Sequence, residues 1–275
     1  MASAEQPISV LVLAGKRSGT IDVLAERAGT THKCLAPIAG RPLIEHVLTA
    51  LDAAPQVATI IVSIDDVHAL SHLPAVKALD AQGRLRITRA QPNLADSIIE
   101  AAEGARFPLL ITTADNALFT PAALATMIET VGATGAEIAA AFARKHAVLA
   151  AHPEGQRRFY AFADDAYSNC NCYWIGSREA LSAANIFRSG GQFSKHPMRI
   201  AQAFGLINLI RFRLGIGTLE SAFARFSRRL RKRLRPVIFD DGSLAIDVDN
   251  ERTYRIVEQI LQARAGKPTP LASAA

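Results

Sequence analysis

A short apolar run near the amino terminus, followed by a long polar connection, constrains the fold more than any other feature. Residues 8–14 (ISVLVLA) are rich in β-branched side chains and carry no charge. Such a run is typical of a strand that is buried on both faces, as in a parallel sheet. The next helical pattern starts only at Pro42, and residues 15–33 before it contain three glycines and several cations. Connections in α/β units usually take about 2–6 residues and longer ones are commonly functional, so we predict a phosphate-handling loop.

The remaining apolar segments alternate between strand and helix patterns as far as residue 131, and become less regular after it. This alternation predicts an α/β fold with a mostly parallel, doubly wound central sheet flanked by helices. Strands are predicted at 59–64, 86–88, 108–112, 138–142, 159–162, 172–175, 237–239 and 244–248, and helices at 42–51, 95–106, 120–131, 178–187, 196–235 and 250–264.

Composition favours one soluble domain. The chain has 275 residues, of which 49% are apolar and 20% are charged. Three cysteines are too few for a disulfide framework, and no signal-like segment or apolar run of the ~20 residues needed to span a membrane is present. We therefore expect a cytoplasmic protein with a single domain over residues 1–265, a basic helical insertion at about 190–235, and a disordered tail at 266–275.

Polar clusters follow the ends of three predicted strands. Gly15-Lys16-Arg17 follows the first strand, Asp115 follows the strand at 108–112, and Asp247-Val248-Asp249 closes a late one. Ligands of open α/β sheets bind beyond the carboxyl ends of the strands. Glycines let backbone amides approach phosphate, cations neutralise it, and separated carboxylates suit magnesium. The pattern predicts a nucleoside triphosphate site, and neither a GxxxxGK[ST] loop nor a GxGxxG fingerprint is present.

Three ordered motifs resemble a known family. LVLAGKRSGT…HKCLAPIAGRPLIEHVL is similar to the signature of nucleotidyltransferases with the Rossmann-like GT-A fold: an LxAGxGxR loop, then PK, then a GxPLI helix start. ITTADNALFTP resembles the family's metal strand, and AIDVDNERTYRIVEQIL resembles its closing element. This group includes molybdopterin guanylyltransferase, sugar-phosphate nucleotidyltransferases and cytidylyltransferases. The chain departs from it at Lys16 in place of glycine, at His32 in place of proline, and at Asn116-Ala117 in place of Met-Pro.

The resemblance implies a magnesium-dependent transfer of a nucleoside monophosphate from an NTP to a small phosphorylated acceptor, with release of pyrophosphate. CTP is slightly favoured over GTP, and the acceptor is not identified. The implied site residues have four roles: catalysis by Lys33 and Arg17; nucleotide binding by Leu13, Ala14, Gly15, Lys16, Arg17, Lys33, Asn93, Ser97 and Asp115; acceptor binding by Asn169 and Asn171; and Mg²⁺ binding by Asp115 and Asp249, with Asp247 as a less favoured ligand.

The net charge of +6 has a local origin. Eleven basic residues and one acidic residue, Glu220, lie in the segment 195–235, so the rest of the chain carries 20 basic and 24 acidic residues. Apolar residues at 223, 226, 230 and 234 form a helical stripe there, with Arg and Lys around it. Peripheral contact with an anionic membrane on the inner face is one interpretation, and a helix packed on the sheet is the other. No aromatic-rich surface accompanies the charge, so no nucleic-acid partner is predicted.

Two alternatives to the nucleotidyltransferase hypothesis remain at the level of the sequence. The first is a GT-A glycosyltransferase that uses a sugar nucleotide, in which Asp247 and Asp249 could form the DxD metal motif. The second is a catalytically degenerate nucleotide-binding protein, which would explain the altered loop. Ordinary roles also compete for single residues, because Lys16 and Arg17 could be solvated charges and Ser97 a helix-start residue. The sequence carries no signal for an oligomeric state.

Overall fold

Strand β1 (Ile8–Leu13) lies inside the central sheet because both of its faces are apolar. Val10 and Val12 belong to the large core on one face of the sheet, and Leu11 belongs to the core on the other face. Strand β4 (Val57–Ile64) repeats this alternation beside it. The computed structural model describes residues 7–16, 22–181, 210–211 and 214–266.

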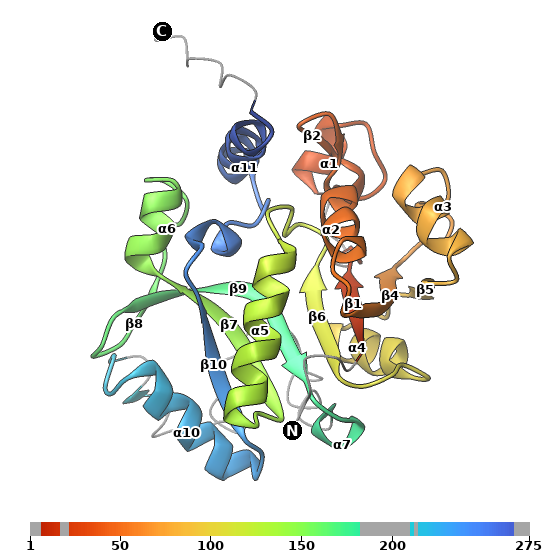
Figure 1. Cartoon of the computed structure of the whole chain (residues 1–275). Helices are drawn as coiled ribbons and strands as arrows, with labels where there is room; N and C mark the ends of the chain where they lie inside the picture. Colours follow the sequence, from red (N-terminus) through yellow and green to blue (C-terminus); the bar gives the residue numbers. More distant parts are fainter. Residues whose placement is uncertain (1–6, 17–21, 182–209, 212–213, 267–275) are drawn as a thin grey trace, which may run out of the picture.

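The described residues form one large sheet with the strand order β10-β7-β9-β6-β1-β4-β5, in which β8 pairs with β9 (Figure 1). All neighbours run parallel except β9, which is antiparallel to β6, β7 and β8. The prediction of a mostly parallel sheet is confirmed. The further strands are β5 (Leu85–Arg89), β6 (Leu109–Thr113), β7 (Ile138–Arg144), β8 (Tyr160–Ala161), β9 (Ala166–Ile175) and β10 (Leu234–Phe239), and a separate pair is formed by β2 (Pro37–Ile38) and β3 (Arg41–Pro42).

Helices cover both faces of the sheet. Residues of α2, α5 and α11 join the larger core on one face, whereas residues of α4 and α7 join the core on the other face. No described helix is long and apolar enough to cross a bilayer. The helices are α1 (Val23–Arg27), α2 (Leu43–Asp52), α3 (Pro74–Ala81), α4 (Leu94–Ala102), α5 (Pro121–Thr134), α6 (Lys145–Ala151), α7 (Arg178–Leu181), α10 (Leu219–Leu230) and α11 (Glu251–Arg264), with 3₁₀ turns η1 (Lys33–Leu35) and η4 (Gly242–Ala245).

The predicted strand at 244–248 is wrong. These residues form η4 and an irregular segment after it, because Asp241 accepts a hydrogen bond from the Ser243 amide and starts the 3₁₀ turn. Gly242 permits the close packing of this turn on α6: a Cβ atom added at Gly242 would lie 2.1 Å from the carbonyl carbon of Ala147. The apolar residues at 244–246 are therefore buried as a turn rather than as a strand.

The basic segment also differs from its prediction as helix up to residue 235. Helix α10 ends at Leu230, where Arg231 takes the left-handed conformation (φ 52°), and β10 follows. Pro236 lies within β10, which is the terminal strand in the sheet order, and a sheet tolerates proline at its edge. Part of the predicted helices, residues 196–209 and 182–187, lies outside the described residues, as does the predicted disordered tail from 267 onward.

Two further differences concern the segments nearest to the site. The long connection after β1 contains α1, whose first turn is capped by the Asp22 carboxylate. The strand predicted at 172–175 begins earlier, since residues 166–171 also belong to β9, and the register of its pairing with β7 shifts between Ala140 and Phe142. Asn171 has φ 46° there, a conformation that asparagine tolerates better than most residues.

Candidate active site

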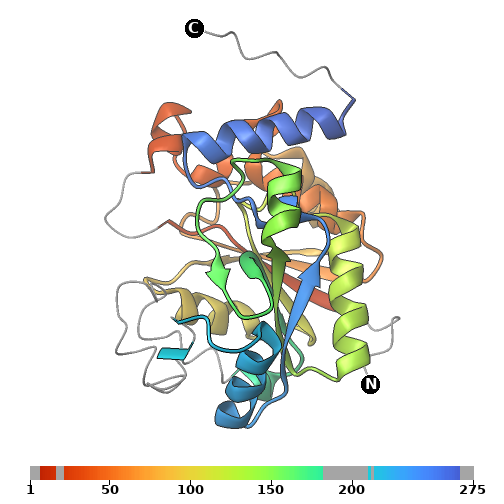
Figure 2. The same cartoon turned by 90° about the vertical axis from the view of Figure 1, so that its left-hand side faces the viewer.

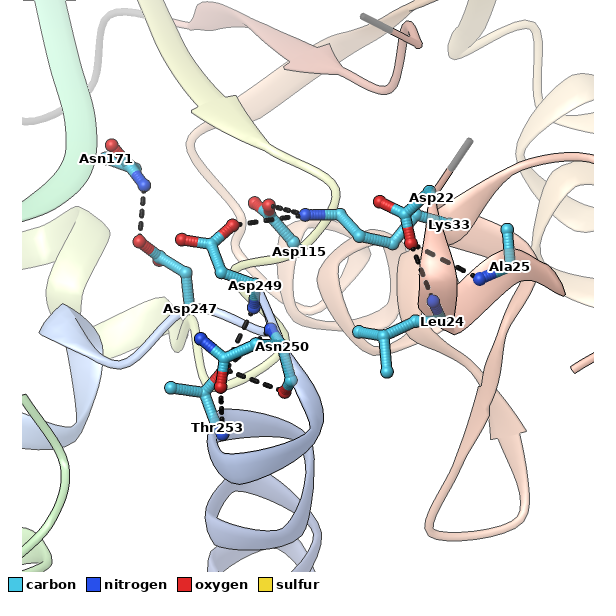
Figure 3. A network of polar contacts seen from close by, with 10 residues as sticks. All are labelled: Asp22, Leu24, Ala25, Lys33, Asp115, Asn171, Asp247, Asp249, Asn250 and Thr253. Atoms are coloured by element: carbon cyan, nitrogen blue, oxygen red, sulfur yellow. Dashed lines mark hydrogen bonds and ion pairs between the residues drawn. The ribbon is translucent and has the colours of Figure 1, made fainter. Parts of the chain in front are cut away.

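Three charged side chains from distant parts of the chain meet beyond the carboxyl end of β6 (Figure 3). The Lys33 ammonium lies 2.5 Å from Asp115 Oδ2 and 3.3 Å from Asp249 Oδ1. Lys33 is the first residue of η1, Asp115 follows β6, and Asp249 directly precedes the cap of α11. The structure thus brings together the three residues on which the predicted site depends.

The two acids are also linked through the backbone. The Val248 amide donates to the Asp115 carbonyl at 3.1 Å, which holds the segment before α11 against the end of β6. The Thr253 hydroxyl accepts hydrogen bonds from the amides of Asp249 and Asn250, and the Asn250 side chain accepts one from the Thr253 amide. This capping box orients the start of α11 and thereby the Asp249 carboxylate.

Burial and charge act in opposite directions on Lys33. Burial by itself lowers the pKa of the Lys33 ammonium, but the carboxylates of Asp115 and Asp249 outweigh it and raise the pKa above its ordinary value. Lys33 therefore stays charged at neutral pH, although its side chain is only 23% exposed. A fixed cation in a partly desolvated position is suited to neutralising phosphate.

Asp247 lies beside this cluster and is almost completely buried. Its Oδ2 accepts a hydrogen bond of 2.5 Å from Asn171 Nδ2 (Figure 3). Burial, followed by the charges of Asp115 and Asp249, raises the pKa of the Asp247 carboxyl well above its ordinary value. Asn171 thus has a structural contact, and the Asn169 carboxamide likewise accepts from the Asn171 amide at 2.6 Å. Both candidate acceptor residues lie on β9 within this network.

The loop after β1 is shaped by an acid that sequence analysis did not single out. The Lys16 amide donates to Asp65 Oδ2 at 2.6 Å, and Asp65 follows the carboxyl end of β4. His32 Nε2 lies 3.8 Å from the same oxygen. The position of Asp65 directly after a buried strand was the available signal, the same signal that identified Asp115. Arg17 lies outside the described residues.

The end of β1 and the start of this loop are formed by Leu13, Ala14 and Gly15. The Ala14 amide donates to the Ser63 carbonyl at 2.8 Å, so the strand pairing extends to the start of the loop. A Cβ atom on Gly15 would lie 2.9 Å from the Ala90 Cβ, so a glycine is required for this approach. The loop therefore lies against Ala90, which directly precedes the turn at 91–97 that contains the nucleotide-binding candidates Asn93 and Ser97.

The nucleotide-binding candidates Asn93 and Ser97 maintain the shape of that turn. The Asn93 side chain caps α4 by accepting from the Asp96 amide at 2.9 Å. The Ser97 hydroxyl accepts from the Gln91 amide at 2.8 Å and is buried. Ser97 thus has the helix-start environment that was its alternative interpretation, and it orders the turn from within.

The donor set near Lys33 fits a magnesium ion. No group of three or more His, Cys, Asp or Glu side chains in the described part of the chain is arranged to hold a metal. However, the Oδ1 atoms of Asp115 and Asp247 are buried without a hydrogen-bond partner, and Asp249 is exposed on the same side of Lys33. Oxygen donors of this kind are those that Mg²⁺ prefers, usually as one or two carboxylates together with substrate phosphates.

The sequence matches the MobA-like NTP transferase domain over residues 10–205. The chain belongs to this family. It is therefore a nucleotidyltransferase of the EC 2.7.7 type, as predicted. Members of this family generally use a divalent metal ion. No curated protein gives a significant sequence match.

Solved structures share the fold of this NTP transferase. A hypothetical transferase from Thermus thermophilus is 24% identical, with a TM-score of 0.74, and the alignment covers 90% of this chain and 99% of the other. A 4-diphosphocytidyl-2C-methyl-D-erythritol synthase from Anaerococcus prevotii is 11% identical (TM-score 0.60; 94% and 97% covered). A CMP:2-keto-3-deoxy-manno-octonic acid synthetase in complex with CTP is 17% identical (TM-score 0.55; 94% and 99% covered). The predicted Rossmann-like nucleotidyltransferase fold is thereby confirmed.

Proposed function

We propose that this NTP transferase moves a nucleoside monophosphate from an NTP, with CTP as the first candidate, to a small phosphorylated acceptor and releases pyrophosphate. The observation that carries the proposal is the position of the Lys33 ammonium between Asp115 and Asp249, at 2.5 and 3.3 Å. A cation and two carboxylates beyond the end of β6 are the groups that a triphosphate and its counter-ion need.

In the proposed reaction, an oxygen of the acceptor phosphate attacks the α-phosphorus of the NTP. The bond from the α-phosphorus to the bridging oxygen breaks, and the electron pair leaves with pyrophosphate. The protein forms no covalent bond to the substrate in such a transfer, so the rate depends on positioning of the two substrates and on neutralisation of the phosphate charge. Lys33 neutralises the charge at the α-phosphate, while the Gly15-Lys16 loop and Arg17 hold the β- and γ-phosphates.

Asp115 and Asp249 are the residues that would hold Mg²⁺, with Asp247 behind them. When bound, Mg²⁺ supplies neutralisation of phosphate charge and orientation of the leaving group. The raised pKa of Lys33 supports its role, since an ammonium that stays protonated at neutral pH contributes a full positive charge to the developing anion.

Two proteins of similar fold support the choice of CTP: one is named as a diphosphocytidyl-methylerythritol synthase, and the other is a synthetase in complex with CTP. The base would lie between the Leu13–Lys16 loop and the Gln91–Ser97 turn, which approach each other at Gly15 and Ala90. The acceptor would enter from β9, where Asn169 and Asn171 lie next to Asp247. We also propose that residues 1–265 act as one domain, since β7 and β10 are adjacent although the basic segment separates them in sequence.

The test is release of pyrophosphate from each of the four NTPs with Mg²⁺ and a panel of sugar phosphates and polyol phosphates. Lys33→Met and Asp115→Asn should each lower kcat/KM by about 10²–10³, the range found when one charge-stabilising group is removed. Lys77→Met, at an exposed position on α3, is the matched control and should retain the wild-type rate. Full activity in Lys33→Met would refute the proposed role of Lys33. A wild-type enzyme that prefers another NTP would overturn the choice of CTP but not the reaction.

A further inference from the structure

Five arginine side chains line a single hollow on the surface of the molecule. The hollow has a volume of about 500 Å³, and no acidic residue is among its described lining residues. Helix α10 carries most of these arginines and lies at the opposite end of the molecule from α11 and α1, which flank the candidate active site (Figures 1 and 2). The lining residues are Arg211, Arg225, Arg228, Arg229 and Arg231.

The Arg225 side chain is only partly satisfied by hydrogen bonds in the described part of the chain. Its Nε atom is buried and has no hydrogen-bond partner, while one terminal nitrogen donates to the Ser221 hydroxyl at 3.1 Å. Burial lowers the pKa of the Arg225 guanidinium, and the nearby charges of Arg211 and Arg228 lower it further. The mutual repulsion of Arg211, Arg225 and Arg228 gives this surface a positive potential, which favours the binding of an anionic group.

Three large apolar side chains are exposed next to these arginines. Ile210 is 49% exposed, Leu214 is 66% exposed and Ile216 is 50% exposed. Two backbone hydrogen bonds connect the described residues here: the Leu214 amide donates to the Ile210 carbonyl, and the Ile216 amide donates to the Arg211 carbonyl. Single exposed apolar residues are ordinary, but three within seven residues beside a basic hollow indicate an interaction surface.

The apolar stripe of α10 itself does not contribute to this surface. Leu219, Ala222 and Phe223 are buried at 3%, 1% and 8% exposure, and Phe223 makes an edge-on contact with the Phe142 ring of β7 at 5.8 Å. The interpretation of α10 as a helix packed on the sheet is therefore the one that the structure supports. Arg228, Arg231 and the side chains of Leu214 and Ile216 are exposed at the surface.

We propose that Ile210, Leu214, Ile216 and the five arginines form a basic face that docks peripherally on a bilayer containing anionic phospholipids. The hollow would take lipid phosphate groups, and the three apolar side chains would enter the interfacial layer. A soluble polyanion would explain only the arginines, whereas a membrane surface explains the arginines and the exposed apolar side chains together. This proposal does not depend on the proposed reaction, since the basic face lies apart from Lys33.

Co-sedimentation of the full chain with vesicles tests the proposal. The protein should bind vesicles of phosphatidylglycerol and phosphatidylcholine, and binding should fall steeply between about 50 mM and about 500 mM salt because exposed charges are screened. Phosphatidylcholine alone should not retain it. Arg211→Gln/Arg228→Gln/Arg231→Asn should weaken partitioning roughly 100-fold, at roughly fivefold for each cation near an anionic surface.

The matched control removes three exposed cations elsewhere, as Lys77→Gln/Arg106→Gln/Arg255→Gln, and should weaken binding far less. Ile210→Ser/Leu214→Ser should also weaken binding, and at high salt as well, because this part of the interaction is not screened. An equal loss of vesicle binding in both triple variants would show that binding depends only on net charge, and this would overturn the proposal. A thermal shift with inorganic polyphosphate, or retention of a short RNA, without recovery on vesicles would overturn it in favour of a soluble anion or a nucleic acid.

Discussion

Replacing Lys33 with methionine keeps most of the apolar stem and removes the ammonium that separates Asp115 from Asp249. The side chains of Lys33 and Asp115 are 23% and 16% exposed, whereas that of Asp249 is 58% exposed. The Asp249 contact resembles an exposed ion pair, which contributes about 0–1 kcal/mol. Breaking a fully buried pair costs about 3–5 kcal/mol. The intermediate burial of the Lys33–Asp115 pair places the loss for Lys33→Met at roughly 2–3 kcal/mol of unfolding free energy.

Thermal unfolding in a chelating buffer measures this loss. A change of 1 kcal/mol moves the Tm of a chain of this size by about 2–4 °C, so Lys33→Met should lower Tm by about 5–10 °C. Asp115→Asn in the same background should restore much of the loss, because the carboxylate left without its cation is then removed. Added Mg²⁺ should stabilise Lys33→Met more than the wild type, since the vacated carboxylates gain a competing cation.

The control for this prediction is Lys77→Met, which removes an exposed ammonium from α3 and should leave Tm within about 1 °C of the wild type. A Tm for Lys33→Met equal to that of this control would refute the reasoning. Strict additivity of Lys33→Met and Asp115→Asn would refute it independently, because residues that interact directly show a coupling free energy.

Three further predictions concern other parts of the molecule. Gly242→Ala should destabilise the fold by roughly 3 kcal/mol or more in urea unfolding, because the added Cβ would meet the α6 backbone at 2.1 Å; a wild-type midpoint would contradict this packing. Asn250→Ala removes the cap of α11 and should cost about 1 kcal/mol in the same assay, and a Ser replacement should recover most of it. The pKa of His46 is lowered by its burial, so the unfolded chain binds the proton more readily and stability should fall as pH drops below about 6.5. His46→Gln should flatten this pH dependence of Tm, and an unchanged slope would contradict the assignment.

Local patterns predicted most of the first half of the fold. The β-branched run at 8–14 has apolar residues on both faces, and Pro42 stands just before the helix that it was expected to open. Four of the five residues at 244–248 are apolar as well, but a glycine that packs on α6 and the capping carboxylate of Asp241 make them a turn. Whether such a segment forms a strand or a turn depends on its contacts with neighbouring elements, and the apolar periodicity of the segment alone does not predict those contacts.

The candidate site likewise contains residues that local patterns predicted and residues that they did not. Lys33 and Asp115 could be chosen from motifs, because each stands at a defined offset from a recognisable strand or helix. Asp65 was not chosen, although it also follows a buried strand and accepts a hydrogen bond from the Lys16 amide, because it belongs to none of the three family motifs. Ser97 shows the converse case, in which a residue in a plausible binding turn forms that turn's internal hydrogen bonds.

The sequence by itself determined the α/β class and the mostly parallel sheet, since burial periodicity and capping act over a few residues. Only the tertiary structure decided that Lys33 meets Asp115 and Asp249, which lie 82 and 216 residues away. The segment before α11 is held at the end of β6 by the Val248 amide, which donates to the Asp115 carbonyl. The tertiary structure also decided that the apolar side of α10 packs on the sheet and that its arginines lie outside, because a helix buries the apolar surface that its neighbours cover.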